Sequence, residues 1–405
     1  MSIFSGAAFA ADEVAEAPTG YNWTGFYIGL GGGAGAVNHT ISVPPLFSFS
    51  GIGGEGIFGE LTVGYDHMLS DRMLLGVFAD GRMGNIQTSL NIGPFGADIT
   101  ADHGFDVGLR AGYLITPRTL AYVLAGYSWQ HFDVSATGFG SVYDWNGGGF
   151  VIGKGFETAI TGNLTMKAEY RYAQYGAEDV FDAGFLFVKP ATHTFHAGLN
   201  YRFGASNGGG AAWDTPDYDW TGLKIGGSFG SGALVHDISI PPLAGFGFNG
   251  IGAEGFFGEV SVGYDWEFGN DWVVGVLADG RYSSIATELN ILGGLFNAAI
   301  DADYGFDVLG RVGKKIDGAT LVYATAGYAW QHFDINASGI GSIYDWGASG
   351  FVVGAGVEAA LSERTAINLE YRYTGYQGED FGFPGFVDVS PSSHTVRAGF
   401  KFKLF

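Results

Sequence analysis

The residues best suited to chemistry are acidic and basic side chains that recur at every second position of several segments. In MKAEYRY (166–172) the charged residues Lys167, Glu169 and Arg171 alternate with apolar and aromatic residues, and INLEYRY (367–373) repeats the pattern. A period of two places the charges on one face of a β-strand. Such a face could form charge rings that select ions in a pore, or ion pairs that fill a narrow interior. Buried charges must be paired, so we favour ion pairs if these strands close into a narrow barrel.

Charges with this placement occur in both halves of the chain. In the first half they are Glu60, Asp80, Arg82, Asp106, Arg110, Glu157, Lys167, Glu169, Arg171 and Arg202. In the second half they are Glu259, Asp279, Arg281, Asp307, Arg311, Glu358, Glu370, Arg372, Lys401 and Lys403. We predict that all of these side chains point into the interior that the strands enclose.

Catalysis and metal binding find little support. The nucleophile motif GxSxG, the phosphate-binding motif GxxxxGK[ST] and a convincing Ser/His/Asp set are missing from the sequence. With no cysteine, thiolate metal sites and disulfides are excluded. Three histidines recur in both halves, as His39/His236, His131/His332 and His193/His394, so a shared metal site is conceivable. No HExxH spacing supports it, and we predict no enzyme activity, no metal and no cofactor.

Composition narrows the class of protein. The 405 residues include 71 glycines, and 41 acidic against 19 basic side chains give a net charge of −22. Nucleic acid is an improbable partner for such an acidic chain, because its binding requires a basic face. The mean hydropathy is positive, yet no run of about 18 apolar residues occurs, which excludes transmembrane helices.

The chain is a tandem duplication. QHFDVSATGFGSVYDW (130–145) returns as QHFDINASGIGSIYDW (331–346), and the match extends from Trp23/Trp220 to His193/His394. We predict a first unit at 21–203, a Gly-rich linker at 204–219 and a second unit at 220–405. Residues 1–20 include a small-x-small pattern typical of a signal-peptide cleavage site, so we expect a signal-peptide remnant there, with a disordered tail as the alternative.

Each unit has the pattern of an up-and-down β-barrel. About eight alternating segments are joined by short turns such as LSDR and TPRT on one side, and by long Gly-rich links on the other. A soluble, lipocalin-like barrel would share this pattern. We favour a transmembrane barrel because aromatic residues gather at strand ends, where an interfacial girdle is expected. These aromatic residues are Trp23, Phe26, Trp129, Phe132, Tyr172 and Tyr175.

Three segments make the family resemblance specific. YNWTGFYIGLGGGAG (21–35), EYRYAQYG (169–176) and RAGFKFKLF (397–405) resemble the small outer-membrane β-barrel proteins of α-proteobacteria, related to the OmpA-like and opacity-type barrels. The resemblance implies eight strands per unit, a place in the outer membrane of a Gram-negative bacterium, extracellular long loops, and a periplasmic linker and termini. It also implies that the terminal Phe405 is an assembly signal read by the barrel-assembly machinery. Outer-membrane lipid and lipopolysaccharide are then the expected surroundings.

The acidic segments DITADHGFD (98–106) and IDADYGFD (300–307) lack the twelve-residue spacing of an EF-hand. In an outer-membrane barrel we expect them to contact divalent cations that bridge lipopolysaccharide, or to keep the loops hydrated.

Two closures of the duplicated sheet are open. Each unit could close as its own eight-stranded barrel, or both could merge into one barrel of sixteen strands. The linker is long for a periplasmic turn, and bulky residues expected to face inward would be misplaced in a wide aqueous lumen. These residues are Phe78, Tyr122, Leu124, Leu309 and Tyr323. We favour two barrels.

The long links PPLFSFSGIGGEGIF (44–58) and PPLAGFGFNGIGAEGFF (241–257) are unusually apolar for segments that face water. Their apolar residues are Leu46, Phe47, Phe49, Ile52, Leu243, Phe246, Phe248 and Ile251. We predict a structural and surface-interaction role in which these loops contact another copy or another surface component. The alternatives are that the loops pack on each other or on the barrel rim, or that one wide barrel conducts small solutes.

Overall fold

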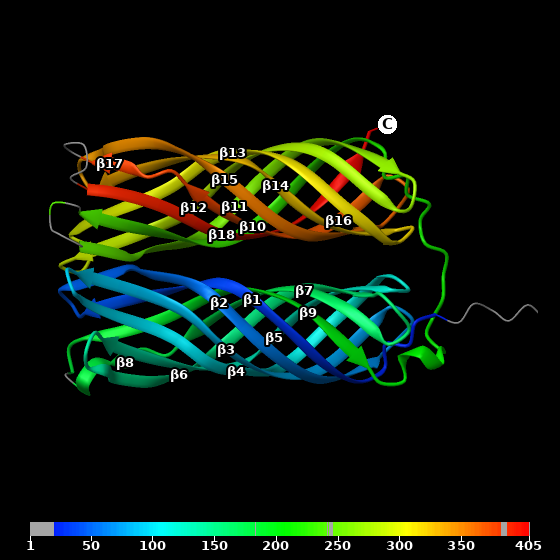
Figure 1. The fold of residues 1–405 in the computed structure, drawn as a ribbon, viewed down its shortest axis with the longest axis horizontal. Helices are drawn as coiled ribbons and strands as arrows, with labels where there is room; N and C mark the ends of the chain where they lie inside the picture. The colour runs from blue at the N-terminus through cyan, green and yellow to red at the C-terminus, as the bar shows by residue number, and fades with distance from the viewer. Residues whose placement is uncertain (1–19, 183, 241, 243–245, 382–386, 405) are drawn as a thin grey trace, which may run out of the picture.

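The computed structural model describes residues 20–404, except 183, 241, 243–245 and 382–386. The signal-peptide remnant predicted at 1–20, apart from residue 20, lies outside the described residues, as do Leu243 and Phe405. Two elongated barrels lie side by side, the first coloured blue to green and the second green to red (Figure 1). The linker connects them at the end that carries the short turns.

The first barrel closes on itself. Its eight long strands are β1 (Gly25–Val43), β2 (Phe47–Met68), β3 (Met73–Ile92), β4 (Phe95–Thr116), β5 (Thr119–Ala136), β6 (Gly140–Ala159), β7 (Leu164–Tyr175) and β9 (Phe187–Arg202). The short β8 (Glu178–Asp179) and the 3-10 turn η1 (Val180–Asp182) lie in the link before β9. All neighbouring strands are antiparallel, and β9 returns to β1 with Tyr27 opposite Arg202 and Ser42 opposite Phe187.

The second barrel repeats this closure after the short turn η2 (Ala205–Asn207). Its strands are β10 (Gly222–Ile240), β11 (Phe246–Phe268), β12 (Trp272–Ile291), β13 (Phe296–Asp317), β14 (Thr320–Ala337), β15 (Gly341–Ala360), β16 (Thr365–Tyr376), β17 (Glu379–Phe381) and β18 (Val387–Lys403), with β17 a short strand in a link. Strand β18 pairs with β10 along its length, with Lys403 opposite Lys224. Two eight-stranded barrels are therefore confirmed, and the sixteen-stranded alternative is wrong because β9 and β18 each pair with the first strand of their own unit.

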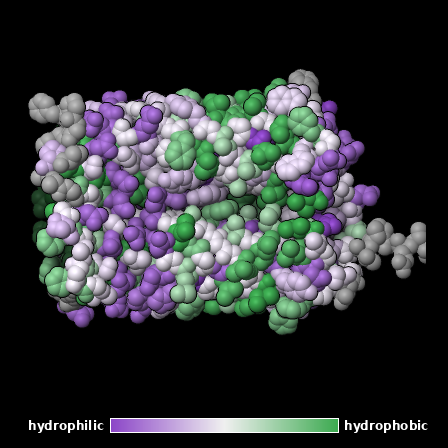
Figure 2. Space-filling model, viewed as in Figure 1, coloured by the Kyte–Doolittle hydropathy of each residue, from purple (hydrophilic) through white to green (hydrophobic). Residues whose placement is uncertain are grey.

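The outer surface shows which way the apolar face points. On β4 the side chains of Phe105, Val107, Leu109 and Tyr113 are all exposed, whereas Asp106 and Arg110 between them are buried. Hydrophobic residues gather over the half of the barrels nearest the linker, and hydrophilic residues dominate much of the other half of this face (Figure 2). An outward apolar band is what a bilayer requires and what a soluble barrel would bury. Strands of about 20 residues exceed the roughly 10 needed to span a bilayer, so the barrels project beyond it.

The interior also corrects part of the predicted aromatic girdle. Trp23, Phe132 and Tyr175 are almost fully buried inside the first barrel, whereas Phe26 is exposed on the outside. Trp129 faces outward and stacks on Phe105 at a centroid distance of 5.4 Å. Alternation along a strand decides the face. Phe132 is three positions from outward-facing Trp129 on β5, so the two side chains lie on opposite faces. Among the described residues, no helix is long and apolar enough to cross a membrane.

The two barrels are joined to each other at both ends. Near the long loops, β2 and β3 pair with β11 and β12 of the other barrel. At the other end, the Thr119 and Thr320 hydroxyls lie 2.8 Å apart. Between these ends the rings of Phe195 and Tyr371 stack at 4.6 Å. The chain therefore forms one paired unit, in which equivalent surfaces of the two copies face each other.

Candidate functional site

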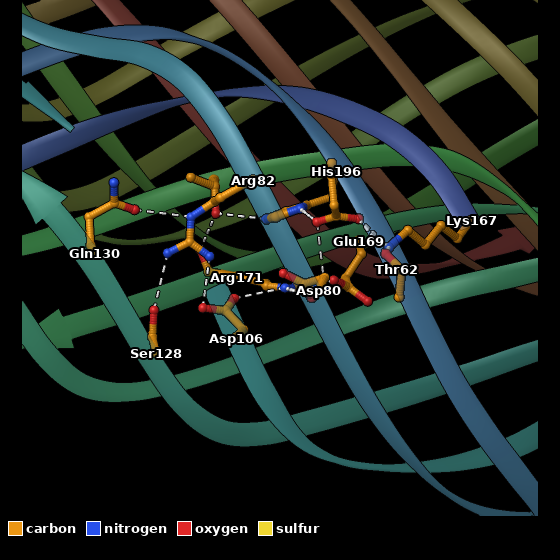
Figure 3. Close-up of polar contacts among 12 residues, drawn as sticks. Thr62, Asp80, Arg82, Asp106, Ser128, Gln130, Lys167, Glu169, Arg171 and His196 are labelled. Carbon is orange, nitrogen blue, oxygen red and sulfur yellow. Dashed lines mark hydrogen bonds and ion pairs between the residues drawn. The ribbon is translucent and has the colours of Figure 1, made fainter. Parts of the chain in front are cut away.

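The inward charges of the first barrel form two networks of ion pairs. In the network nearer the long loops, Nη1 of Arg171 lies 2.5 Å from Oδ2 of Asp80 and 2.7 Å from Oδ2 of Asp106 (Figure 3). Arg82 reaches the other oxygen of Asp106 at 2.7 Å. Nζ of Lys167 lies 2.5 Å from Glu60, so cations from β3 and β7 cross the interior to carboxylates on β2, β3 and β4.

The second network of this barrel lies nearer the short turns. Arg110 contacts Asp66 through Nε at 2.8 Å and Glu157 through Nη1 at 2.8 Å. Arg202 contacts the same two carboxylates, Asp66 at 2.6 Å and Glu157 at 3.0 Å. Two guanidinium groups thus meet two carboxylates, and all four side chains are buried. Such a closed set satisfies its own charges without bulk water.

The second barrel keeps the networks but relocates some of the cations. Arg372 contacts Asp279 at 2.7 Å and Asp307 at 2.8 Å, as Arg171 contacts its partners in the first barrel. Asn368 stands where the first barrel has Lys167, and the missing cation is replaced by Arg397, which stands where the first barrel has His196 and pairs with Glu259.

In the second barrel, the network nearer the short turns shows the same exchange of cation positions. Lys224 occupies the position of Tyr27 and contacts Asp265 at 2.8 Å, while Lys401 occupies the position of Asn200 and contacts Glu358 at 2.7 Å. Arg311 binds Glu358 at 2.7 Å. Pairing of the buried carboxylates is preserved although the cations move between strands. That is the pattern expected of charges that fill an interior, where the pairing matters more than the position.

Nearly all predicted inward charges lie in these networks. Those that are buried, with at most 8% of the residue exposed, are Glu60, Asp80, Asp106, Arg110, Glu157, Lys167, Glu169, Arg171, Arg202, Glu259, Asp279, Asp307, Arg311, Glu358, Glu370 and Arg372. Arg82, Arg281 and Lys401 are partly buried with side-chain exposures of 10%, 7% and 14%. Lys403 is the exception, because it lies at the rim nearest the linker and pairs with Asp219 at 2.7 Å.

The predicted set of inward charges omits five members of the networks: Asp66, His196, Lys224, Asp265 and Arg397. Asp66 lies six positions from Glu60, and Asp265 six from Glu259, so strict alternation places them on the inward face and could have found them. Lys224 and Arg397 carry no equivalent charge in the first unit, so a comparison of the halves gave no signal for them. Alternation did place His196 and Arg397 on the polar face of the last strand of each unit, but they were not counted among the inward charges.

The cavities found among the described residues of these networks are small. A cavity of about 10 Å³ lies among Tyr27, Arg110 and Arg171 in the first barrel. A cavity of about 30 Å³ lies among Lys224, Arg311 and Arg372 in the second. One water requires roughly 10–15 Å³, so these cavities hold about one or two waters rather than a column. Toward the long loops, the stacked rings of Phe132 and Trp145 fill the first interior further, with a centroid distance of 5.0 Å.

The recurrent histidines lie in three separate places and do not form one metal site. His39 and His236 are buried against Phe132 and Phe333. His193 and His394 instead reach across to the other barrel, where Nε2 of each lies 2.9 Å from a carboxylate, Glu254 and Glu55 respectively.

His131 and His332 face outward beyond the aromatic girdle, outside the part of the barrels that crosses the bilayer. Nδ1 of His332 lies 2.7 Å from Asp303. Burial alone would lower the pKa of His332, but the hydrogen bond and charge of Asp303, helped by Asp345, outweigh it and raise the pKa above 6.5. Asp303 and Asp345 therefore stabilise the protonated form of His332 relative to that of a free imidazole.

The predicted loop contacts are made largely within the chain. Phe47 and Phe49 lie opposite Ile291 and Leu289 of the other barrel, and Ile52 lies opposite Ile251. Phe248 lies opposite Leu90. Phe246, two residues before Phe248 on β11, is partly buried. These loops thus form the seam between the barrels, while Leu46 stays 55% exposed.

Two highly exposed apolar side chains among the described residues of the long-loop end were not predicted. Phe139 and Ile340 are 81% and 76% exposed at equivalent tips of the β5–β6 and β14–β15 turns. Each is flanked by glycines with positive φ, namely 83° and 73° at Gly138 and Gly140. Because residues other than glycine rarely adopt such angles, the TGFG and SGIG sequences fix a tight turn that projects the central side chain. The glycine spacing was the available signal.

Comparison with known proteins agrees with this architecture. A model of the outer membrane protein beta-barrel domain matches residues 1–203 and again residues 207–402. The chain belongs to this outer-membrane β-barrel family. The predicted family and location in the outer membrane are thereby confirmed, with one family domain in each half.

Relatives resemble single units of the chain. The 31 kDa outer-membrane immunogenic protein of Brucella melitensis is 29% identical over 236 residues, which cover 50% of this chain and 96% of that protein. The 22 kDa outer membrane protein of Rhizobium leguminosarum is 36% identical over 153 residues, which cover 37% of this chain and 67% of that protein. Neisserial surface protein A covers 44% of the chain and 97% of its own, with 16% identity and a TM-score of 0.29.

Proposed function

We propose that this outer-membrane protein is a non-conducting, non-enzymatic pair of barrels that stabilises the envelope and presents an apolar contact surface outside the cell. The observation that carries the proposal is that each lumen is crossed by buried, mutually paired charges, as in Arg171 with Asp80 and Asp106. A diffusion channel would need a continuous water path past these networks. Water-sized cavities support a sealed interior instead.

The contact surface is assigned to the turn tips rather than to the loops at the seam. Phe139 and Ile340 project from equivalent turns, and Phe95 and Leu295 are also 69% and 67% exposed at neighbouring turns of the same end. Exposed apolar side chains at one end of a protein favour a contact surface. The partner that fits this chemistry is another apolar surface, such as the tips of a second copy on a neighbouring cell.

Replacing both tips with serine, as Phe139→Ser with Ile340→Ser, should weaken cell–cell aggregation of a Gram-negative host that displays the protein. Burying one such side chain contributes about 1.5–3 kcal/mol, so loss of two should lower the association constant at least about tenfold. The measurement is the sedimentation rate of cells with matched surface amounts of protein.

The matched control carries the same type of change at the opposite end of the barrels. Leu69→Ser with Leu361→Ser removes two side chains that are 58% and 48% exposed in short turns. This control should aggregate like the unaltered protein. Equal aggregation by the Phe139/Ile340 variant, at equal surface amounts, would remove the support for the contact surface.

A further inference from the structure

A β-bulge in the first barrel brings two consecutive side chains to the same side of the sheet. The pairing of β4 with β5 shifts register between Ala101 and His103, so Asp102 is left without a cross-strand partner. In a regular strand Asp102 and His103 would face opposite sides. At the bulge both lie on the outer surface, and bulges commonly re-aim side chains in this way at functional sites.

The bulge assembles a compact set of ligand atoms. Oδ1 of Asp102 lies 2.9 Å from Nδ1 of His103 and 2.8 Å from Nδ1 of His131. His103 and His131 are cross-strand partners, and their rings stack at 4.6 Å with an angle of 26°. One ligand atom from each of the three residues lies within 4.8 Å of the others.

This set lies where ions from outside can reach it. Asp102, His103 and His131 have side-chain exposures of 38%, 46% and 19%. The ring of His103 lies 5.6 Å from that of Trp129, which belongs to the girdle, so the set stands just beyond the bilayer on the long-loop side. Its access does not depend on the barrel interior.

We propose that Asp102, His103 and His131 bind a divalent first-row transition metal ion, of which zinc is the test case. Two imidazole nitrogens and one carboxylate are the ligand types of zinc sites with an open fourth position. Calcium and magnesium require mainly oxygen ligands and should bind far more weakly. The proposal is independent of the contact surface and of the sealed interiors.

The second barrel provides an internal control. Its bulge places Asp303 and His332 as in the first barrel, with 2.7 Å between Nδ1 of His332 and Oδ1 of Asp303. Tyr304 stands in place of His103, and its ring stacks on His332 at 4.6 Å. A neutral phenol is a poor zinc ligand, so we expect one site per chain, on the first barrel alone.

The experiment measures zinc binding to tag-free, detergent-refolded protein by calorimetry. The unaltered chain should bind one zinc ion, and the same titration with calcium should give no saturable site. His103→Tyr, which copies the second barrel, should weaken zinc binding by at least about 10–100-fold, the range for loss of even a supporting group at a metal site. Tyr304→His should add a second zinc site. Heat-dependent mobility on a denaturing gel verifies that each variant is folded.

Two results would overturn the proposal. One is zinc binding by folded His103→Tyr with unchanged affinity and stoichiometry, since the ion would then lie elsewhere. The other is a folded chain that binds no zinc at millimolar concentration. Replacing the exposed His67, near the short turns, with alanine should leave binding unchanged and controls for adventitious histidine binding. Electron paramagnetic resonance of bound Cu²⁺ gives a second readout, because coupling to two imidazole nitrogens should fall to one in His103→Tyr.

Discussion

Replacing Arg171 with methionine should lower the free energy of unfolding by about 3–5 kcal/mol, the usual cost of removing one partner from a buried ion pair. Arg171 is about 2% exposed and contacts Asp80, Asp106 and Glu169 at once. Methionine fills much of the volume but leaves carboxylates without their cation in an interior that water hardly enters. Equilibrium urea unfolding in phospholipid vesicles, followed by tryptophan fluorescence, measures the change.

Two further variants separate lost charge from lost packing. Arg364→Met changes an exposed arginine in a short turn of the second barrel and should alter stability by less than about 0.5 kcal/mol. Adding Asp80→Asn to Arg171→Met removes one of the unpaired carboxylates and should recover part of the lost stability. A loss below about 1 kcal/mol for Arg171→Met would mean that the network is hydrated, and the sealed interior would be wrong.

Replacing both glycines of the contact between the barrels, as Gly53→Val with Gly252→Val, should separate the long-loop ends of the two barrels while each barrel stays folded. A Cβ at Gly53 would lie 2.5 Å from Cα of Gly252, and a Cβ at Gly252 would lie 2.7 Å from Cα of Gly53. Backbone must move to relieve such contacts, at a cost of about 1–3 kcal/mol per site. Ile52 and Ile251, which pair beside these glycines, would then lose their contact.

A disulfide reports this separation cleanly because the chain has no cysteine. Ser48→Cys and Asn290→Cys place thiols at positions that are opposite each other across the seam. In the otherwise unaltered chain, oxidation should form the disulfide and so protect both thiols from a maleimide reagent. In the valine variant, the rate of disulfide formation should be at least roughly tenfold lower. The control is Gly59→Val with Gly258→Val, because a Cβ at either of these glycines would meet no atom within 4 Å. Equal rates in both variants would show that the seam is not a close contact.

Alternation in the sequence predicted much of the fold because a strand that faces lipid on one side and paired charges on the other must obey it. Lys167, Glu169 and Arg171 could be placed inside from the sequence for this reason. The same rule fails where a bulge interrupts the strand, so nothing in DITADHGFD showed that Asp102 and His103 share a face. Duplication predicted equivalent sites, but it could not reveal that Arg397 replaces the cation lost at Asn368.

The arrangement of the two units was harder to predict. Bulky inward residues such as Tyr122 and Leu309 correctly favoured two barrels, because a wide lumen would leave them in water. The seam between the barrels depends on which outer surfaces contact each other, and the alternating sequence pattern does not indicate which surfaces these are. Gly53 and Gly252 look like other glycines of the chain, and the apolar loop residues Phe49 and Phe248 could equally have faced a partner.

Single-channel recording in a planar bilayer tests the central claim most directly, namely that both barrels are sealed by their own ion pairs. The folded, detergent-purified chain is added to the bilayer, and its insertion is verified by recovery of folded protein from the membrane. We expect the current to stay at the baseline, because the paired charges and water-sized cavities leave no continuous path. Large, stable and uniform conductance steps from inserted protein would contradict the account and would make solute diffusion the primary role.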